Sequence, residues 1–327
     1  MHEVVIFTVV LAVLFDISNG WNDSANAIAT VVSTRVLTPA KAVVLSACMN
    51  ILGAFLTTAV AKTIGKDVVD PKAVTEMVVA AALFSGFAWN FAMTWLGLPV
   101  SASHALIGGL IGASVAYGGV GILNISGIIK IFSALITSPL IGIFFGFGFM
   151  KLIMKLFGTL PVGVINQHFG KLQILSSSFM ALSHGSNDAQ KVMGIITLSL
   201  VSGGYLHSVE VPFWVILICA VAMGLGTAFG GWKVIKTMGV SMLKLQPIHG
   251  FAAETSATAI ILGASHLGLP VSTTHVIATS IMGVGATRRL SAVRWGVAGK
   301  IVLAWVLTLP ACTVLAWCLC TVATLLT

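Results

Sequence analysis

The chain has 327 residues, of which 57% are hydrophobic and only 8% are charged, and its formal net charge is +8. Soluble globular proteins carry about 25% charged residues, so this composition excludes a water-soluble domain. The apolar runs are continuous rather than alternating, which predicts an all-α polytopic membrane protein with about 10–12 membrane segments. Its Lys and Arg residues lie between the apolar runs and form no single soluble patch, so we expect a lipid bilayer and no nucleic acid as partner.

The first apolar run, from Val4 to Phe15, leads directly into a polar stretch. The carboxylate and carboxamide side chains of this stretch are Asp16, Asn19, Asn22, Asp23 and Asn26. A carboxylate in the middle of a membrane costs several kcal/mol unless it is paired or hydrated, and irregular backbone is tolerated there only in a buried or cavity-lining position. We therefore expect a helix that is interrupted at Asp23 and exposes a polar site. The alternative is an internal polar network that only holds helices together.

The next informative element is "LGLPVSASH" at residues 96–104. Proline is favoured at a helix start, and hydroxyl side chains just after it can cap backbone N–H groups. Such a helix start, with the positive end of the helix dipole, favours an anion. We expect an anion-binding cup at Ser101 and Ser103, with simple capping as the alternative. A long apolar stretch, Ile125–Phe157, then closes this half of the chain.

The second half repeats these elements in the same order. The stretch "GSND" at 185–188 matches "GWND" at 20–23, and "LGLPVSTTH" at 267–275 matches "LGLPVSASH". Nearly constant spacing predicts a duplication, with an N-terminal repeat over residues 1–160 and a C-terminal repeat over residues 161–327. An odd number of crossings in each half would give the two inverted repeats, with discontinuous helices or re-entrant segments, of secondary transporters. The matching polar residues of the second half are Asn187, Asp188, Ser272, Thr273 and Thr274.

Charge compensation is the open question for an anion site here. Neither motif contains an Arg, and only Lys191 lies close to one. Helix N-termini supply part of the compensation, and bound cations could supply the rest. The candidate sodium ligands are Asp23, Asn26, Asp188 and the intramembrane Glu254. Protonation of the aspartates is the competing way to remove their charge.

Catalytic machinery is not expected. The sequence offers no nucleophile–base pair, no metal-ligand set and no phosphate loop of the Walker type, so we expect neither an enzyme nor a cofactor beyond co-transported sodium.

The stretches "GWNDSANAIAT" and "GSNDAQKVMGII", together with "LPVSASH" and "LPVSTTH", resemble the signature repeats of the inorganic phosphate transporter (PiT) family. The resemblance covers both halves and implies cation-coupled symport of inorganic phosphate, two inverted repeats and a homodimer. Two departures matter: Ala102 replaces a hydroxyl, and Asn50 stands where many sodium-coupled relatives carry a Glu. The residues that the resemblance places around phosphate and its cations are Asn22, Asp23, Asn26, Ser101, Ser103, Asn187, Asp188, Ser272, Thr273 and Thr274.

The expected function is therefore a secondary active symporter of the cell membrane that imports inorganic phosphate with sodium. Proton-coupled transport of phosphate or of a metal–phosphate complex is the alternative, ahead of a sulfate permease or a channel. A channel needs a continuous lined path with weak binding sites, and two capped anion cups fit a closed substrate site better.

Overall fold

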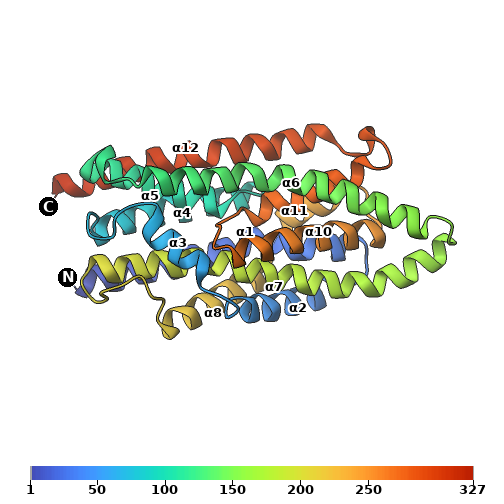
Figure 1. The fold of residues 1–327 in the computed structure, drawn as a ribbon, viewed down its shortest axis with the longest axis horizontal. Helices are drawn as coiled ribbons and strands as arrows, with labels where there is room; N and C mark the ends of the chain where they lie inside the picture. Colours follow the sequence, from blue (N-terminus) through green and yellow to red (C-terminus); the bar gives the residue numbers. More distant parts are fainter. Residues whose placement is uncertain (1, 327) are drawn as a thin grey trace.

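The computed structural model describes residues 2–326 and shows a bundle of helices (Figure 1). Within these residues the only β-type pairing is an isolated bridge between Val69 and Leu123, so the predicted all-α class is confirmed. The α-helices are α1 (His2–Ser33), α2 (Pro39–Gly53), α3 (Ala59–Asp67), α4 (Glu76–Leu96), α5 (Ala102–Gly118), α6 (Ile125–Phe157), α7 (Val162–Ser202), α8 (Phe213–Phe229), α9 (Trp232–Lys236), α10 (Pro247–His266), α11 (Thr273–Ala286) and α12 (Trp295–Leu326). Short 3-10 helices η1 (Val120–Ile122) and η3 (Leu290–Ala292) and a π-helical turn η2 (Thr237–Ser241) complete the structure.

Among the described residues, four helices are long and apolar enough to cross a membrane, namely α1, α4, α6 and α12. Helix α8 forms a fifth candidate together with α9 and η2, from which it is bent by 65°. Figure 1 shows α6 and α12 along one long side of the bundle and α2 and α8 along the other. The remaining helices of residues 2–326 are too short or too polar to qualify as membrane spans by length and hydropathy.

The predicted interruptions at the Asn-Asp motifs are wrong. Helix α1 runs without a break through Asp23, and α7 runs without a break through Asp188. Asn and Asp disfavour a helix when their side chains bond to nearby backbone groups. Here their side chains bond to other helices, so nothing competes with the helical backbone.

The discontinuities lie instead at the two "LGLPV" stretches. Helix α4 ends at Leu96 before α5 begins, and α10 ends at His266 before α11 begins. Gly97 and Gly268 take φ angles of 75° and 68°, a left-handed conformation that stops a helix and that glycine adopts easily. Because α4 packs against α5 and α10 packs against α11, each pair forms a helical hairpin with its tip at the Pro-Val-Ser sequence.

The two central helices are the motif helices α1 and α7, which pack against each other. Asp23 of α1 lies next to His184 of α7. Farther along the chain, Thr34 just after α1 donates a hydrogen bond to Gln173, which comes earlier in α7 than His184. The helices are therefore antiparallel. This is the relation that inverted repeats require of equivalent elements.

Two apolar cores lie on either side of the polar stretch. One contains Phe15 of α1 and Leu106 of α5, and the other contains Ile28 of α1 and Ile277 of α11. The stretch from Asp16 to Asp23 thus lies at the level where one core gives way to the other. A buried polar layer at this depth is stable only if its members are paired or bind ions.

Candidate functional site

Asn22 and Asn187 fix the hairpin tips with the same hydrogen bonds in both halves. The Asn22 amide donates to Thr94 Oγ1 at 2.8 Å and to the Leu98 carbonyl at 3.3 Å. The Asn187 amide donates to Ser265 Oγ at 2.9 Å and, at 3.3 Å, to the carbonyl of Leu269. Each Asn therefore ties the middle of its motif helix to the adjoining hairpin.

The first serine of each Pro-Val-Ser sequence caps the helix that follows. Ser101 Oγ accepts from the His104 backbone N–H at 3.2 Å, and Ser272 Oγ accepts from that of His275 at 3.3 Å. The capping alternative is thus observed for both residues, while each hydroxyl proton stays available to an acceptor. Ser103 Oγ reaches across and donates to the Val271 carbonyl at 2.9 Å, so the two tips touch.

The predicted threonines and aspartates come together at this junction. Thr274 Oγ1 donates to Asp23 at 2.7 Å, and Thr273 Oγ1 donates to Asp188 at 3.1 Å. The Asn26 amide donates to Thr274 Oγ1 at 3.0 Å and to Thr273 Oγ1 at 3.3 Å. All five side chains are buried, and they come from the three helices α1, α7 and α11.

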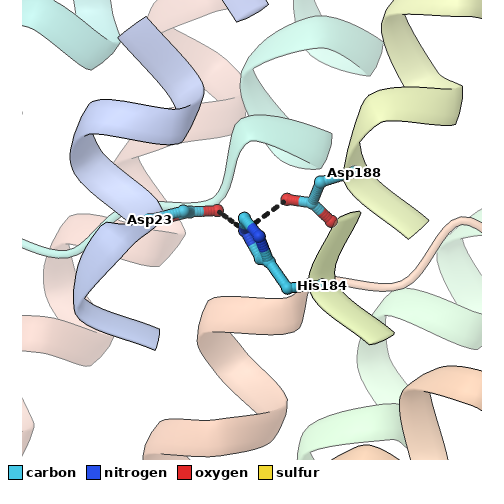
Figure 2. A group of neighbouring side chains, drawn as sticks. All are labelled: Asp23, His184 and Asp188. Carbon is cyan, nitrogen blue, oxygen red and sulfur yellow. Dashed lines mark ion pairs between the residues drawn. The ribbon is translucent and has the colours of Figure 1, made fainter. Parts of the chain in front are cut away.

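His184 lies between the two aspartates, as Figure 2 shows. Its Nε2 is 3.6 Å from Asp23 Oδ2 and 3.6 Å from Asp188 Oδ2, and the donor atoms of the three residues lie within 4.8 Å of one another, close enough to hold a metal ion. Its Nδ1 lies 2.9 Å from Asn50 Oδ1, and the Asn50 amide donates to Thr227 Oγ1 at 2.9 Å, which fixes the ring. Sequence reasoning missed His184, although its place one helical turn before Asp188 was a usable signal.

Lys191 supplies a built-in positive charge. Its Nζ lies 2.6 Å from Asp188 Oδ1, and both side chains are 1% exposed. Lys191 stands three residues after Asp188, whereas Asn26 stands three residues after Asp23. The two halves therefore differ in charge at this matching position of their motifs.

Glu254 is not part of this junction. Its carboxylate accepts hydrogen bonds from Thr30 Oγ1, Gln173 Nε2 and Ser176 Oγ. Thr30 is one turn beyond Asn26 on α1, so Glu254 forms a separate network next to the aspartate junction. The structure thus gathers three of the four candidate sodium ligands and holds the fourth apart.

His104 and His275 pack against each other where the tips meet. Their ring centroids are 4.8 Å apart, and the His275 ring stacks on Trp305 at 3.9 Å. The Trp305 indole N–H donates to the Pro99 carbonyl at 3.0 Å. These contacts orient the tips, which is a packing role.

Comparison with known proteins gives a consistent result. The phosphate transporter family model matches residues 19–316. A probable low-affinity inorganic phosphate transporter of Bacillus subtilis is 46% identical to this chain, and the match covers 93% of this chain and 92% of that protein. One of Rhizobium meliloti is 47% identical, and the match covers 93% of this chain and 91% of that protein. A solved structure described as the sodium-dependent phosphate transporter is 26% identical, with a TM-score of 0.91 over 99% of this chain and 100% of that one. The chain therefore belongs to the phosphate transporter family identified by its motifs, and it is a multi-pass transporter of inorganic phosphate in the cell membrane rather than an enzyme.

Proposed function

We propose that this chain imports inorganic phosphate by secondary symport with sodium, and that the junction of the two hairpin tips with Asp23 and Asp188 is its binding site. The observation that carries the proposal is the convergence of paired carboxylates and threonine hydroxyls from both halves at one buried place. The repeated bonds of Asn22 and Asn187 support two equivalent halves, which we place at residues 1–160 and 161–327. The protein acts as a homodimer, as the resemblance to its family implies.

The site suits a protonated oxyanion. The Ser101 hydroxyl and the N-termini of α5 and α11 can donate to phosphate oxygens. The hydroxyls of Ser103 and Thr273 can do so once they turn away from the Val271 carbonyl and from Asp188. H2PO4⁻ and HPO4²⁻ also carry a proton that can be donated to a carboxylate such as Asp23. Fully ionised sulfate carries none, so its oxygens would be repelled by the same carboxylate. The arrangement therefore favours phosphate over sulfate.

Sodium is supported by charge balance and by structural similarity. Asp23 and Asp188 carry two negative charges, Lys191 returns one, and phosphate adds one or two more. Each helix N-terminus contributes only about half an elementary charge, so the loaded site still needs a cation. Carboxylate and hydroxyl oxygens are ligands suited to a small hard cation, and the similar solved structure is described as sodium-dependent.

Proton coupling is the second candidate, and His184 is the observation that favours it. Its Nε2 lies 3.6 Å from a carboxylate oxygen of each aspartate, so the ring is placed to pass a proton between them. Lys191 also favours proton coupling, because its positive charge already neutralises Asp188 without a bound ion. The two candidates predict different driving ions.

Uptake of radiolabelled phosphate into proteoliposomes separates these candidates. Four conditions are needed: an inward sodium gradient, an inward proton gradient, both gradients and neither. Sodium symport predicts accumulation above equilibrium with the sodium gradient alone. Accumulation with the proton gradient alone would transfer the assignment to protons, and equal uptake in all four conditions would indicate a channel. An excess of unlabelled sulfate should leave uptake unchanged.

A further inference from the structure

A second buried polar cluster lies beside the aspartate junction. It consists of Asp16, Asn19 and Asn90, which are 0%, 1% and 0% exposed. Within residues 2–326, both carboxylate oxygens of Asp16 and both amide groups of the asparagines have no hydrogen-bond partner. In this respect Asp16 differs from Asp23 and Asp188, because each of those two carboxylates accepts a hydrogen bond from a protein side chain.

The position of Asn90 follows from the packing of α4 on α1. Near one end of the contact, Gly86 packs against the ring of Phe15. Near the other end, Thr94 accepts a hydrogen bond from Asn22. Asn90 lies one turn from both Gly86 and Thr94 on the same face of α4, so it meets α1 midway between Phe15 and Asn22.

Asn19 has the matching place on α1. It lies four residues after Phe15 and three before Asn22, so it meets α4 at the level of Asn90. Asp16 lies three residues before Asn19 on the same side of the helix. Helix spacing thus places the three side chains side by side, with Asp16 at the edge of the α1–α4 contact that is nearer to α7.

The chemistry of this group points to a small monovalent cation. A buried carboxylate without a partner costs several kcal/mol, and a cation removes that cost. One carboxylate and two carboxamides provide hard oxygen ligands and a single negative charge, which one sodium ion balances. An anion is excluded by the charge of Asp16, and a divalent cation would be left with one uncompensated charge.

The cluster is also placed to communicate with the phosphate site. Asp16 lies seven residues before Asp23, so both project from the same side of α1. Asp16 also interacts electrostatically with Asp188 and Lys191 of α7. A positive charge gained at Asp16 therefore lowers the negative potential at the neighbouring junction and favours binding of phosphate there.

We propose that Asp16, Asn19 and Asn90 bind one coupling sodium ion, at a site separate from the Asp23–His184–Asp188 junction. This inference rests on sodium symport as the function. It explains why the sequence carries polar residues before the Asn-Asp motif that take no part in the junction.

Equilibrium binding of ²²Na⁺ to the purified full-length protein tests the site, together with the ratio of sodium to phosphate taken up by proteoliposomes. Asp16→Asn removes the charge at nearly constant shape and should lose one bound sodium per chain and lower the uptake ratio by one. Asn90→Leu keeps the carboxylate and removes one ligand, which should weaken sodium binding about tenfold or more. Asp67→Asn is the matched control, because that partly exposed carboxylate lies outside both clusters, and it should bind sodium like the wild type.

Unchanged sodium number and affinity in Asp16→Asn and Asn90→Leu would overturn the site and leave sodium symport standing. If the wild-type protein binds no sodium and its phosphate uptake does not depend on sodium, both the sodium site and sodium symport are overturned. That result can be obtained before any variant is made. Elution as a single species from size exclusion identifies folded variants. If Asp16→Asn does not fold, Asn90→Leu carries the test alone.

Discussion

Lys191 offers a stringent test of the charge arrangement, because its removal is expected to affect stability before function. Its Nζ is 2.6 Å from Asp188 Oδ1 at a place where both side chains are 1% exposed. Lys191→Met keeps the length of the side chain and removes the charge. Breaking a buried ion pair by removing one partner costs about 3–5 kcal/mol, because the remaining charge stays buried without compensation.

The same reasoning predicts that a second change rescues the first. In the double variant Lys191→Met with Asp188→Asn, both charges of this ion pair are removed, and loss of both partners is often nearly neutral. The four proteins form a double-mutant cycle that is read by thermal unfolding in detergent. We expect the double variant to be more stable than Lys191→Met, and we expect sodium to raise the unfolding temperature of Lys191→Met more than that of the wild type. Additive effects, or a Lys191→Met protein as stable as the wild type, would refute this account of the pair.

Three further predictions concern the junction and its packing. Asp23→Asn and Asp188→Asn should each abolish gradient-driven phosphate uptake while the protein still inserts and elutes as a single species, and wild-type uptake by either would show that its acid is not needed. Ser103→Ala and Thr274→Ala should each raise the KM for phosphate about 10- to 150-fold, because losing one hydrogen bond to a charged group costs about 1.5–3 kcal/mol. An unchanged KM in both variants would leave these hydroxyls with a structural role only. Gly185→Val should destabilise the protein by about 1–3 kcal/mol or more, because a side chain at this position meets the backbone of α2; an unchanged unfolding temperature would contradict that close contact.

Much of the fold could be predicted from the sequence because the signals are repeated. Apolar runs indicated a helical membrane protein, and the two Asn-Asp and Pro-Val-Ser motifs indicated a duplicated plan. The structure explains the repetition in physical terms, since Asn22 and Asn187 make the same pair of bonds to their hairpins. Residues with the same local task in both halves are visible in the sequence as repeats.

The helix breaks were misplaced because polarity was taken as a sign of broken backbone. Asp23 and Asp188 stay in continuous helices, since their hydrogen-bond partners are side chains and not nearby backbone groups. The breaks belong to Gly97 and Gly268, which turn the chain before each proline. Local backbone preference, rather than polarity, decides where the helices stop.

The asymmetric features of the site could not be deduced from the repeats. His184 and Lys191 have no counterparts of the same type in the first half, where Asn19 and Asn26 stand at the matching positions. Their roles depend on contacts between α1, α2 and α7, which are distant in the sequence. Glu254 was grouped with the aspartates by chemistry alone, and only the packing of α10 places it in its own network.

The central claim is that sodium and phosphate bind to this protein in a linked manner. The most direct measurement is calorimetric titration of phosphate into the purified transporter, once in sodium and once in choline at equal ionic strength and pH. Linkage requires that if sodium tightens phosphate binding, phosphate tightens sodium binding by the same factor. The account predicts a lower Kd for phosphate in sodium and a matching gain in sodium affinity when phosphate is present. Equal phosphate affinity in the two titrations would contradict it.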